Sequence, residues 1–369
     1  MAIKIQSQIK AYRLAKAGSE PAPEGFVAAE DRRLSIVKVP ELTGVLRWEK
    51  RPRPVGGNPS WTYMVEAPSG AFGITIGHIE SGHASPFEVW VNGDRAPRGL
   101  SALSKSISMD MRSLDRNWLA KKLVALQKVS GDPFVLPMPD GSEVLVNSPV
   151  DAFARLIQYR CAELGAFDQA SNDTLVASMM SAKEPKTTAD GTLSWTVDVV
   201  NPATEDDFCL FLKEAQLPNG RRRPFSLWLA GDYPRSLDGL CKSLSLDMRI
   251  VDVGWVLQKL EQLRDVAEHK AEFRAQVPGT EKTQWYPSTV AYIAALVQHR
   301  FKVHGYCDDR GVPTGRTVLS VIDNRAMKDA KSSPQTKHAV ACSACGAIGT
   351  TSRQGGCEIC VSCGATRCD

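Results

Sequence analysis

An internal duplication limits what this chain of 369 residues can fold into more than any other feature does. Residues 103–112 (LSKSISMDMR) match residues 240–249 (LCKSLSLDMR), and each matching pair is 137 residues apart. Further blocks match in the same order at slightly different offsets, namely 60–62 with 194–196, 86–91 with 224–229 and 158–160 with 298–300. Loop insertions produce such small changes of offset, so the sequence predicts one structural unit that is built twice.

The secondary structure expected for each copy is a few strands followed by helices. Alternating β-branched and aromatic residues predict strands at 61–65, 72–77 and 87–91 in the first copy and at 208–212 in the second. Apolar residues recur at helical spacing in residues 100–113, and further helices are expected at 117–126 and 149–164. Ser148 and Pro149 are a typical N-cap and first residue for the third helix, and its counterpart begins near 287–288.

We therefore expect an α+β fold with two tandem copies of a small antiparallel sheet packed with about three helices, followed by a small zinc ribbon. Linker-like composition at 15–32 and 307–337 separates the parts. The expected organisation is an N-terminal strand and linker at 1–45, repeats at 46–168 and 185–306, a linker at 307–337 and a cysteine-rich ribbon at 338–369.

Composition excludes several classes of protein. Lysine and arginine exceed aspartate and glutamate by only 45 to 41, too small a basic excess for a general nucleic-acid coat, so nucleic acid is an unlikely partner. No apolar run approaches the ~20 residues of a membrane helix, and the N-terminal residues do not resemble a signal peptide. Six of the ten cysteines fall in residues 342–369, which favours a cytoplasmic protein with one thiol-rich module over a secreted disulfide scaffold.

The spacing of these six cysteines predicts a zinc site. Two Cys-x-x-Cys-Gly motifs, at 342–346 and 360–364, are separated by a short spacer. Zn²⁺ takes four thiolates in a tetrahedron, and a gap of two residues lets one turn present two sulfur atoms. The glycine that follows each motif allows the backbone to turn beneath the metal. The favoured ligands are Cys342, Cys345, Cys360 and Cys363.

A second assignment of the ligands stays open. In it, zinc is held by Cys342, Cys345, Cys357 and Cys360, and Cys363 with Cys368 forms a dithiol. The favoured assignment leaves Cys357 and Cys368 instead. Either way, two thiols remain beside a metal, and accessible thiolates are what thiol exchange requires.

Other residues could carry a site in the duplicated body, and we interpret most of them as structural. Lys105 with Arg112, and Lys242 with Arg249, could bind a phosphate, although a solvated helix face is favoured; the sequence leaves nucleotide binding unknown. Asp110 and Asp247 are expected to cap or pair locally, and residues 221–223 to form a solvated loop. Six tryptophans are expected in the core: Trp61, Trp90, Trp118, Trp195, Trp228 and Trp255.

Two parts of the chain resemble a known family. The sequence FEVWVN at 87–92, followed after a turn by LSALSKSI at 100–107, resembles the small TSCPD domain near the C-terminus of adenosylcobalamin-dependent (class II) ribonucleotide reductases. The tail also resembles the six-cysteine terminus of those enzymes. In some of them this C-terminal portion is a separate small subunit, and the order of domain and ribbon here looks like that subunit.

The chain also departs from that family. The Thr-Ser-Cys-Pro-Asp run that gives the domain its name is absent, and the second copy has SLWLA at 226–230 in place of EVWVN. Two copies are more than the family leads one to expect. The chain also lacks room for the ten-stranded catalytic barrel, so it could not reduce ribonucleotides alone.

The resemblance implies an accessory role in deoxyribonucleotide synthesis. The chain would dock on the barrel-bearing catalytic subunit, which alone would bind adenosylcobalamin, and relay reducing equivalents through its C-terminal thiols. Cys368 would be the terminal shuttle thiol, paired with Cys357 or alternatively Cys363, and a thioredoxin-like reductant would regenerate the pair. A different interpretation is a non-catalytic zinc-ribbon adaptor that binds protein or nucleic acid.

Overall fold

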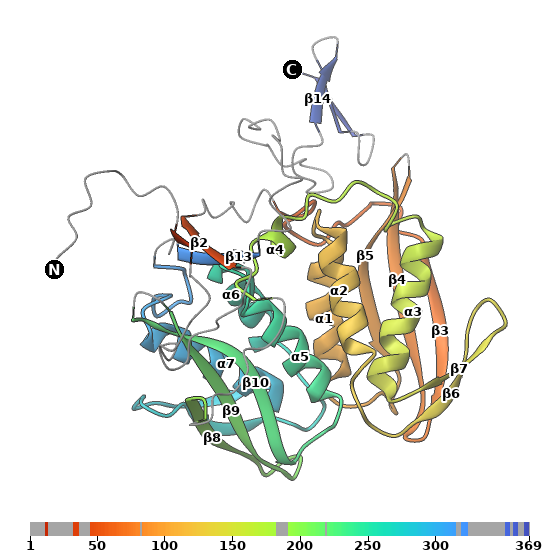
Figure 1. The fold of residues 1–369 in the computed structure, drawn as a ribbon. Helices are drawn as coiled ribbons and strands as arrows, with labels where there is room; N and C mark the ends of the chain where they lie inside the picture. Colours follow the sequence, from red (N-terminus) through yellow and green to blue (C-terminus); the bar gives the residue numbers. More distant parts are fainter. Residues whose placement is uncertain are drawn as a thin grey trace, which may run out of the picture.

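The computed structural model describes residues 12–13, 32–36, 45–81, 83–181, 191–217, 220–314, 319–323, 351–354, 357–360 and 365–368. In these residues the fold is α+β, with small antiparallel sheets and seven helices. Most of them belong to two similar units that lie beside one another (Figure 1).

The first unit begins with a sheet of order β3-β4-β5. Phe72, Ile74 and Ile76 alternate along β4 and are fully buried, which is why this stretch folds as a strand with one covered face. Its elements are β3 (Ser60–Ala67), β4 (Gly70–Ser81), β5 (His83–Asn92), α1 (Leu100–Met111), α2 (Arg116–Leu126), β6 (Phe134–Pro137), β7 (Glu143–Val146) and α3 (Pro149–Glu163).

The second unit repeats these elements in the same order, so the predicted duplication is confirmed. Its sheet has the order β10-β9-β8, with each neighbouring pair antiparallel. Its elements are β8 (Ser194–Asn201), β9 (Asp206–Gln216), β10 (Arg222–Asp232), α5 (Leu237–Asp247), α6 (Val253–Arg264), β11 (Phe273–Gln276), β12 (Thr283–Tyr286) and α7 (Thr289–Val303).

The third helix of each unit starts at an equivalent serine. The Ser148 side chain accepts a hydrogen bond from the Asp151 amide at 3.2 Å and donates to the Val129 carbonyl at 2.7 Å. Ser288 accepts from the Ala291 amide at 3.1 Å and likewise donates to a carbonyl oxygen of the preceding loop. The predicted caps are confirmed, and each also ties its helix to the segment that follows the second helix.

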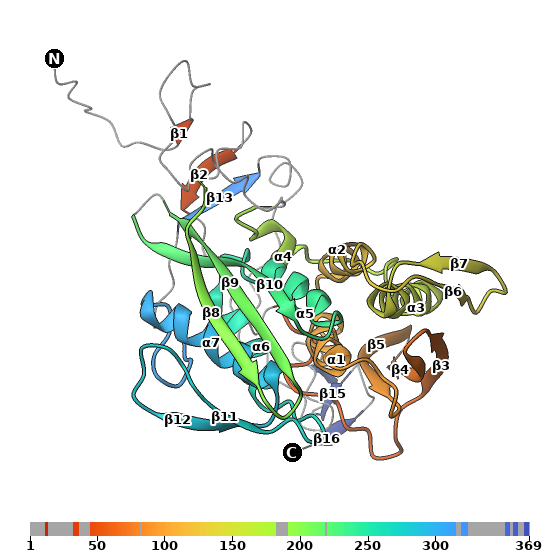
Figure 2. The ribbon, with the colours of Figure 1, turned by 90° about the horizontal axis from the view of Figure 1, so that it is seen from below.

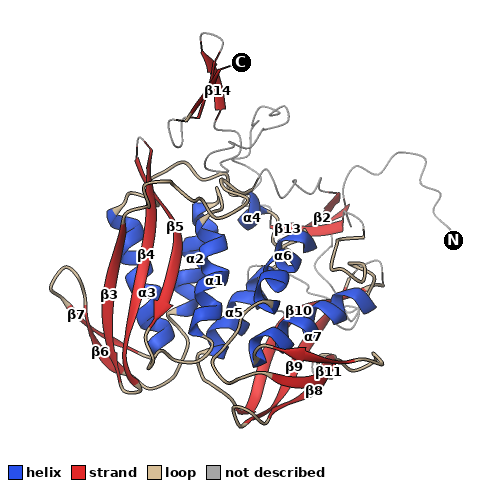
Figure 3. Cartoon of the chain, turned by 180° about the vertical axis from the view of Figure 1, so that it is seen from behind, coloured by secondary structure: helices blue, strands red, loops and turns tan. Residues whose placement is uncertain are grey.

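The two units pack through their helices. Helix α1 lies on β5, α5 lies on β10, and α1 and α5 pack against each other. Seen from below and from behind, the helices lie between the two three-stranded sheets (Figures 2 and 3). The Oγ atoms of the equivalent residues Ser106 and Ser243 are 3.3 Å apart. Because equivalent residues can meet only at the axis that relates them, the units are arranged about a local two-fold axis beside these serines.

Further elements flank the two units. Helix α4 (Thr174–Ala177) lies between them in the chain. Strand β13 (Leu319–Asp323), within the predicted linker, pairs with β2 (Arg32–Ile36), which also pairs with β1 (Tyr12–Arg13). A last sheet has the order β14 (Thr351–Gln354), β15 (Cys357–Cys360), β16 (Thr366–Cys368). Among the described residues, no helix combines the length and the apolar character needed to span a membrane.

Candidate functional site

The cysteine cluster falls partly within the described residues. Cys342, Cys345 and Cys363 lie outside them. Cys357 and Cys360 are the two ends of β15, and Cys368 ends β16. These strands are antiparallel, and Cys357 is the direct partner of Cys368 in their register. The structure thus brings together the backbones of the two residues that the sequence analysis favoured as the shuttle pair.

The other described ligand candidate, Cys360, faces the first unit. Its side chain is buried in an apolar cluster with Trp48, Ile79 and Phe87. The Cys360 amide also donates to the Ala365 carbonyl at 2.8 Å, which links β15 to the start of β16. The last sheet is therefore seated on the segment that leads into the first unit. Within the described ranges, no group of three or more His, Cys, Asp or Glu residues is placed to hold a metal.

A groove of about 1030 Å³ lies between the two units, near this seat. One wall is β5 and α1 of the first unit, the opposite wall is α6 of the second, and residues 49–53 close one side. Lys105 bridges the walls, because its Nζ donates to the Gln262 carbonyl at 2.6 Å. Phe87, which packs on Cys360, also lines the groove.

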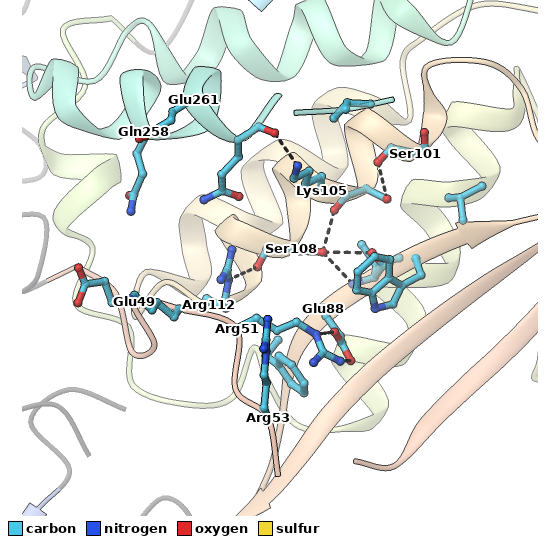
Figure 4. A pocket seen from close by; sticks show the side chains of 18 of the residues that line it. Glu49, Arg51, Arg53, Glu88, Ser101, Lys105, Ser108, Arg112, Gln258 and Glu261 are labelled. Carbon is cyan, nitrogen blue, oxygen red and sulfur yellow. Dashed lines mark hydrogen bonds and ion pairs between the residues drawn. The ribbon is translucent and has the colours of Figure 1, made fainter. Parts of the chain in front are cut away.

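Arg112 lines the groove (Figure 4) and differs from the other charged side chains there in being buried without an ion-pair partner among the described residues. The expectation of a solvated helix face is wrong for this residue and for its counterpart Arg249, because they are only 8% and 7% exposed. The Arg112 Nε donates to the Ser108 carbonyl at 3.3 Å, and the two terminal nitrogens of Arg112 have no hydrogen-bond partner among the described residues. Burial lowers the pKa of the Arg112 guanidinium, and the nearby charges of Glu88 and Asp110 only partly offset this effect.

The neighbouring arginine, by contrast, is paired. Arg51 donates to both carboxylate oxygens of Glu88, with Nε–Oε2 and Nη2–Oε1 distances of 2.6 and 3.0 Å. Asn58 donates to the same carboxylate at 3.2 Å. The Glu88 charge is therefore already satisfied by Arg51 and Asn58, and no ion pair in the described residues joins it to Arg112.

Four buried charges lie at the local two-fold axis. Lys122 Nζ is 3.0 Å from Asp110 Oδ2 and 2.7 Å from the nearer oxygen of Asp247. Lys259 Nζ is 2.6 Å from Asp110 Oδ1 and 3.1 Å from Asp247 Oδ1. Each lysine thus contacts the aspartate of its own unit and that of the other unit. The expectation of purely local pairing for Asp110 and Asp247 is wrong, since these carboxylates join the two copies.

The electrostatics of this quartet keep it charged. Burial alone would raise the pKa of the Asp110 carboxyl, but the ammonium groups of Lys122 and Lys259 outweigh burial, and its pKa lies below the usual value. Burial would lower the pKa of Lys122, but the two carboxylates raise it. At Lys259 burial outweighs the same two carboxylates and lowers the pKa to about 8, which still leaves this ammonium group charged at pH 7. Two positive and two negative charges balance, so the quartet is a buried connection between the units and leaves no free group for chemistry.

The six tryptophans that were expected in the core differ in burial. Trp118 and Trp255 are fully buried, as predicted, and their Nε1 atoms donate to Asp110 and Asp247 at 2.8 Å. Trp61, Trp90 and Trp228 were expected in the core but are 37%, 49% and 55% exposed, and Trp195 is half-buried. Strand alternation explains Trp90 and Trp228, because each points to the sheet face opposite its buried neighbours. Trp61 is on the same face as the buried Val65 but lies near the end of β3, where the Arg160 guanidinium of α3 is 4.3 Å from its ring centroid.

Arg223 was expected in a solvated loop, but it is buried at the start of β10. Its guanidinium donates to the carbonyl oxygens of Met248 and Val251 at 3.1 and 2.9 Å. Burial lowers the pKa of Arg223 to about 10. Arg223 therefore organises the loop between α5 and α6 and does not face a ligand.

Comparison with protein-family models, with curated proteins and with solved structures gives no match for this chain. The functional argument therefore depends on the residues and on the geometry described above.

Proposed function

We propose that this chain is an accessory subunit of a class II, adenosylcobalamin-dependent ribonucleotide reductase. It docks on the barrel-bearing catalytic subunit and relays reducing equivalents through Cys357 and Cys368. The observation that carries the proposal is the register of β15 and β16, in which these two cysteines are direct partners. The sequence resemblance of the tail supplies the rest of the argument.

The register suits a reversible disulfide. Opposite residues of an antiparallel pair have Cα atoms about 4.5–5.5 Å apart, and disulfides span Cα separations of about 4.4–6.8 Å. Cys357 and Cys368 can therefore be oxidised and reduced without a change of strand register. A relay needs this property, because the pair must pass through both states in every cycle.

The relay is a sequence of two thiol exchanges. The thiolate of Cys368 attacks the disulfide left in the catalytic subunit after substrate reduction, which forms a mixed disulfide and releases one partner thiolate. Cys357 then attacks Cys368, so that the second partner thiol is released and a Cys357–Cys368 disulfide forms. A thioredoxin-like dithiol reduces this disulfide in the same manner. Each pair of exchanges transfers two electrons and two protons from one dithiol to one disulfide. Adenosylcobalamin stays on the catalytic subunit.

We propose Cys342, Cys345, Cys360 and Cys363 as the zinc ligands. Four thiolates suit Zn²⁺, which would hold the ribbon together as a structural crosslink. Cys360 is a ligand in both assignments, and its buried side chain, which packs on the first unit, suits a fixed ligand better than a mobile thiol. The pairing of Cys357 with Cys368 in the register supports the choice of Cys363 over Cys357 as the fourth ligand. Zinc bound here would fix the β15–β16 hairpin that carries the relay pair.

The test is turnover of a class II catalytic subunit that lacks its own C-terminal thiols, with this chain and a thioredoxin system. The unmodified chain should support many turnovers, whereas Cys368→Ser should stop the reaction after about one turnover and retain zinc. Cys209→Ser is the matched control, because Cys209 is a partly exposed cysteine on β9, outside the ribbon. Full multiple-turnover activity of the Cys368→Ser variant would contradict the relay.

A further inference from the structure

We infer that the groove between α1 and α6 binds a small molecule that carries phosphate groups. This inference goes beyond the relay and does not depend on the cysteines. It starts from Arg112, which lines the groove and is only 8% exposed, and whose two terminal nitrogens have no hydrogen-bond partner among the described residues and keep contact with the solvent of the groove.

A guanidinium that is largely removed from water and lacks hydrogen-bond partners raises the free energy of the folded protein unless a ligand supplies those partners. A buried charge without a partner is strongly unfavourable, and proteins normally pair such groups or bind an ion with them. A phosphate accepts two parallel hydrogen bonds from one guanidinium, which matches the two terminal nitrogens that Arg112 offers. In Figure 4, Arg112 lies between Gln258 and Arg51. The Gln258 Oε1 on the opposite wall is buried without a hydrogen-bond partner, and because it is an acceptor it would take a hydroxyl or amino donor from the organic part of the ligand rather than the phosphate.

The charge of the lining favours an anion. Its basic residues are Lys50, Arg51, Arg53, Lys105 and Arg112, and its acidic residues are Glu49, Glu88 and Glu261. Glu88 is held by Arg51 and Asn58, and Glu49 and Glu261 are exposed, and none of the three makes an ion pair with Arg112 among the described residues. The groove therefore keeps a positive excess at its buried end.

The size and the aromatic content favour a small molecule over a peptide side chain. A volume of about 1030 Å³ is at the upper end of small-molecule pockets and exceeds what one carboxylate side chain fills. Trp90 lines the groove and is half exposed, with Arg51 Cζ 5.8 Å from its ring centroid. A flat organic group attached to the phosphate could stack on this ring.

The equivalent helix of the first unit, α2, carries different side chains at the positions that form the α6 wall of the groove. Gln258, Glu261 and Gln262 of α6 correspond to Lys121, Val124 and Ala125 of α2 at the offset of 137 residues. Lys242, the counterpart of Lys105, reaches the Lys128 carbonyl with an Nζ–O distance of 3.5 Å. The lysine bridge is thus kept in both halves, whereas the polar wall is present only at the groove.

The experiment is titration calorimetry of the full chain with inorganic tripolyphosphate, ATP, adenosine and hexaglutamate. We expect one saturable site for tripolyphosphate and ATP, tighter binding of ATP if its base stacks on Trp90, and weaker binding of adenosine and hexaglutamate. Arg112→Gln should weaken tripolyphosphate binding roughly ten- to a hundredfold, and Arg112→Lys should restore part of it.

The matched pair is Lys105→Met, which should weaken binding, and Lys242→Met, which removes the equivalent lysine outside the groove and should not. Thermal unfolding of each variant shows whether the fold is retained. Lack of saturable tripolyphosphate binding up to about 1 mM would overturn the inference. Equal affinity for hexaglutamate and tripolyphosphate, or equal effects of the two lysine variants, would also overturn it.

Discussion

The charge quartet and the groove lie in the same interface between the units, but the two copies have equivalent residues in the quartet and different residues at the groove. In the quartet, Asp110 and Lys122 of the first unit are matched by Asp247 and Lys259 of the second, residue for residue. At the groove, α6 presents glutamines and a glutamate where α2 presents a lysine, a valine and an alanine. One part of the interface has kept both copies alike, and the other has not.

The local two-fold axis explains this contrast. On the axis, each lysine contacts the carboxylate of both units, so a change in one copy would leave buried charges unpaired in the other. Away from the axis, the two equivalent contacts are separate from each other, so the residues of one contact can change while those of the other stay the same. The quartet is therefore where symmetry is structurally required, and the groove is where a new property can arise in one copy.

The largest predicted effect comes from removing one lysine of the quartet. Lys122→Met leaves two buried carboxylates with one ammonium group, and we expect the free energy of unfolding to fall by about 3–5 kcal/mol. Lys259→Met should cost about the same, because the two lysines have equivalent places. Urea unfolding measures both, and a loss below about 1 kcal/mol in either would contradict the structural requirement.

A charge-balanced variant sharpens this test. Lys122→Met combined with Asp247→Leu removes one charge of each sign, so the remaining pair stays neutral. We expect this double variant to be more stable than Lys122→Met alone, since it leaves no excess buried charge. A double variant less stable than the single one would show that shape, rather than charge balance, dominates the site.

The quartet should also make the interface sensitive to acid. The pKa of Asp110 is lower in the folded protein than in the unfolded chain, so its contribution is complete above the unfolded pKa of about 4 and is lost as pH falls through the folded value. In Asp110→Asn this part of the acid dependence should disappear, whereas Asp94→Asn, an exposed control, should keep it. Unfolding in urea between pH 7 and pH 3 measures the difference, and an unchanged slope in Asp110→Asn would contradict the prediction.

A smaller effect tests the symmetry at the helix caps. Ser148→Ala and Ser288→Ala each remove an N-cap and a bond to a carbonyl oxygen, and each should cost about 1 kcal/mol. The two losses should be similar, because both serines make the same pair of hydrogen bonds. A difference between the two losses that exceeds the smaller loss would show that the two helix caps contribute unequally to the free energy of unfolding.

Sequence patterns predicted the fold well where they extend over many residues. The repeat offset, the strand alternation and the capping serine led to the units, to the strands of their three-stranded sheets and to helices α1, α2 and α3. The hairpins β6–β7 and β11–β12 were missed, because four-residue strands give little periodicity. Asp140-Gly141, a common hairpin turn, was the signal that could have revealed the first.

The candidate sites were less predictable because they depend on contacts between distant residues. Lys122 and Asp247 are 125 residues apart, and only packing of the two units shows that they touch. Arg112 was expected on a solvated face, since a helix pattern does not reveal which distant segments lie around the residue in the folded protein. For the cysteines, spacing left two pairings open, and the β15–β16 register, which depends on folding, favours one of them.

The most direct test of the proposed relay is to map the disulfide that forms when the zinc-loaded full chain is mildly oxidised. Peptide mass spectrometry under non-reducing conditions identifies the linked cysteines, and alkylation of the remaining thiols shows which ones zinc protects. We predict a Cys357–Cys368 disulfide, one retained zinc ion, and protection of Cys342, Cys345, Cys360 and Cys363. A Cys363–Cys368 disulfide, or no disulfide within the tail, would contradict the proposed pair.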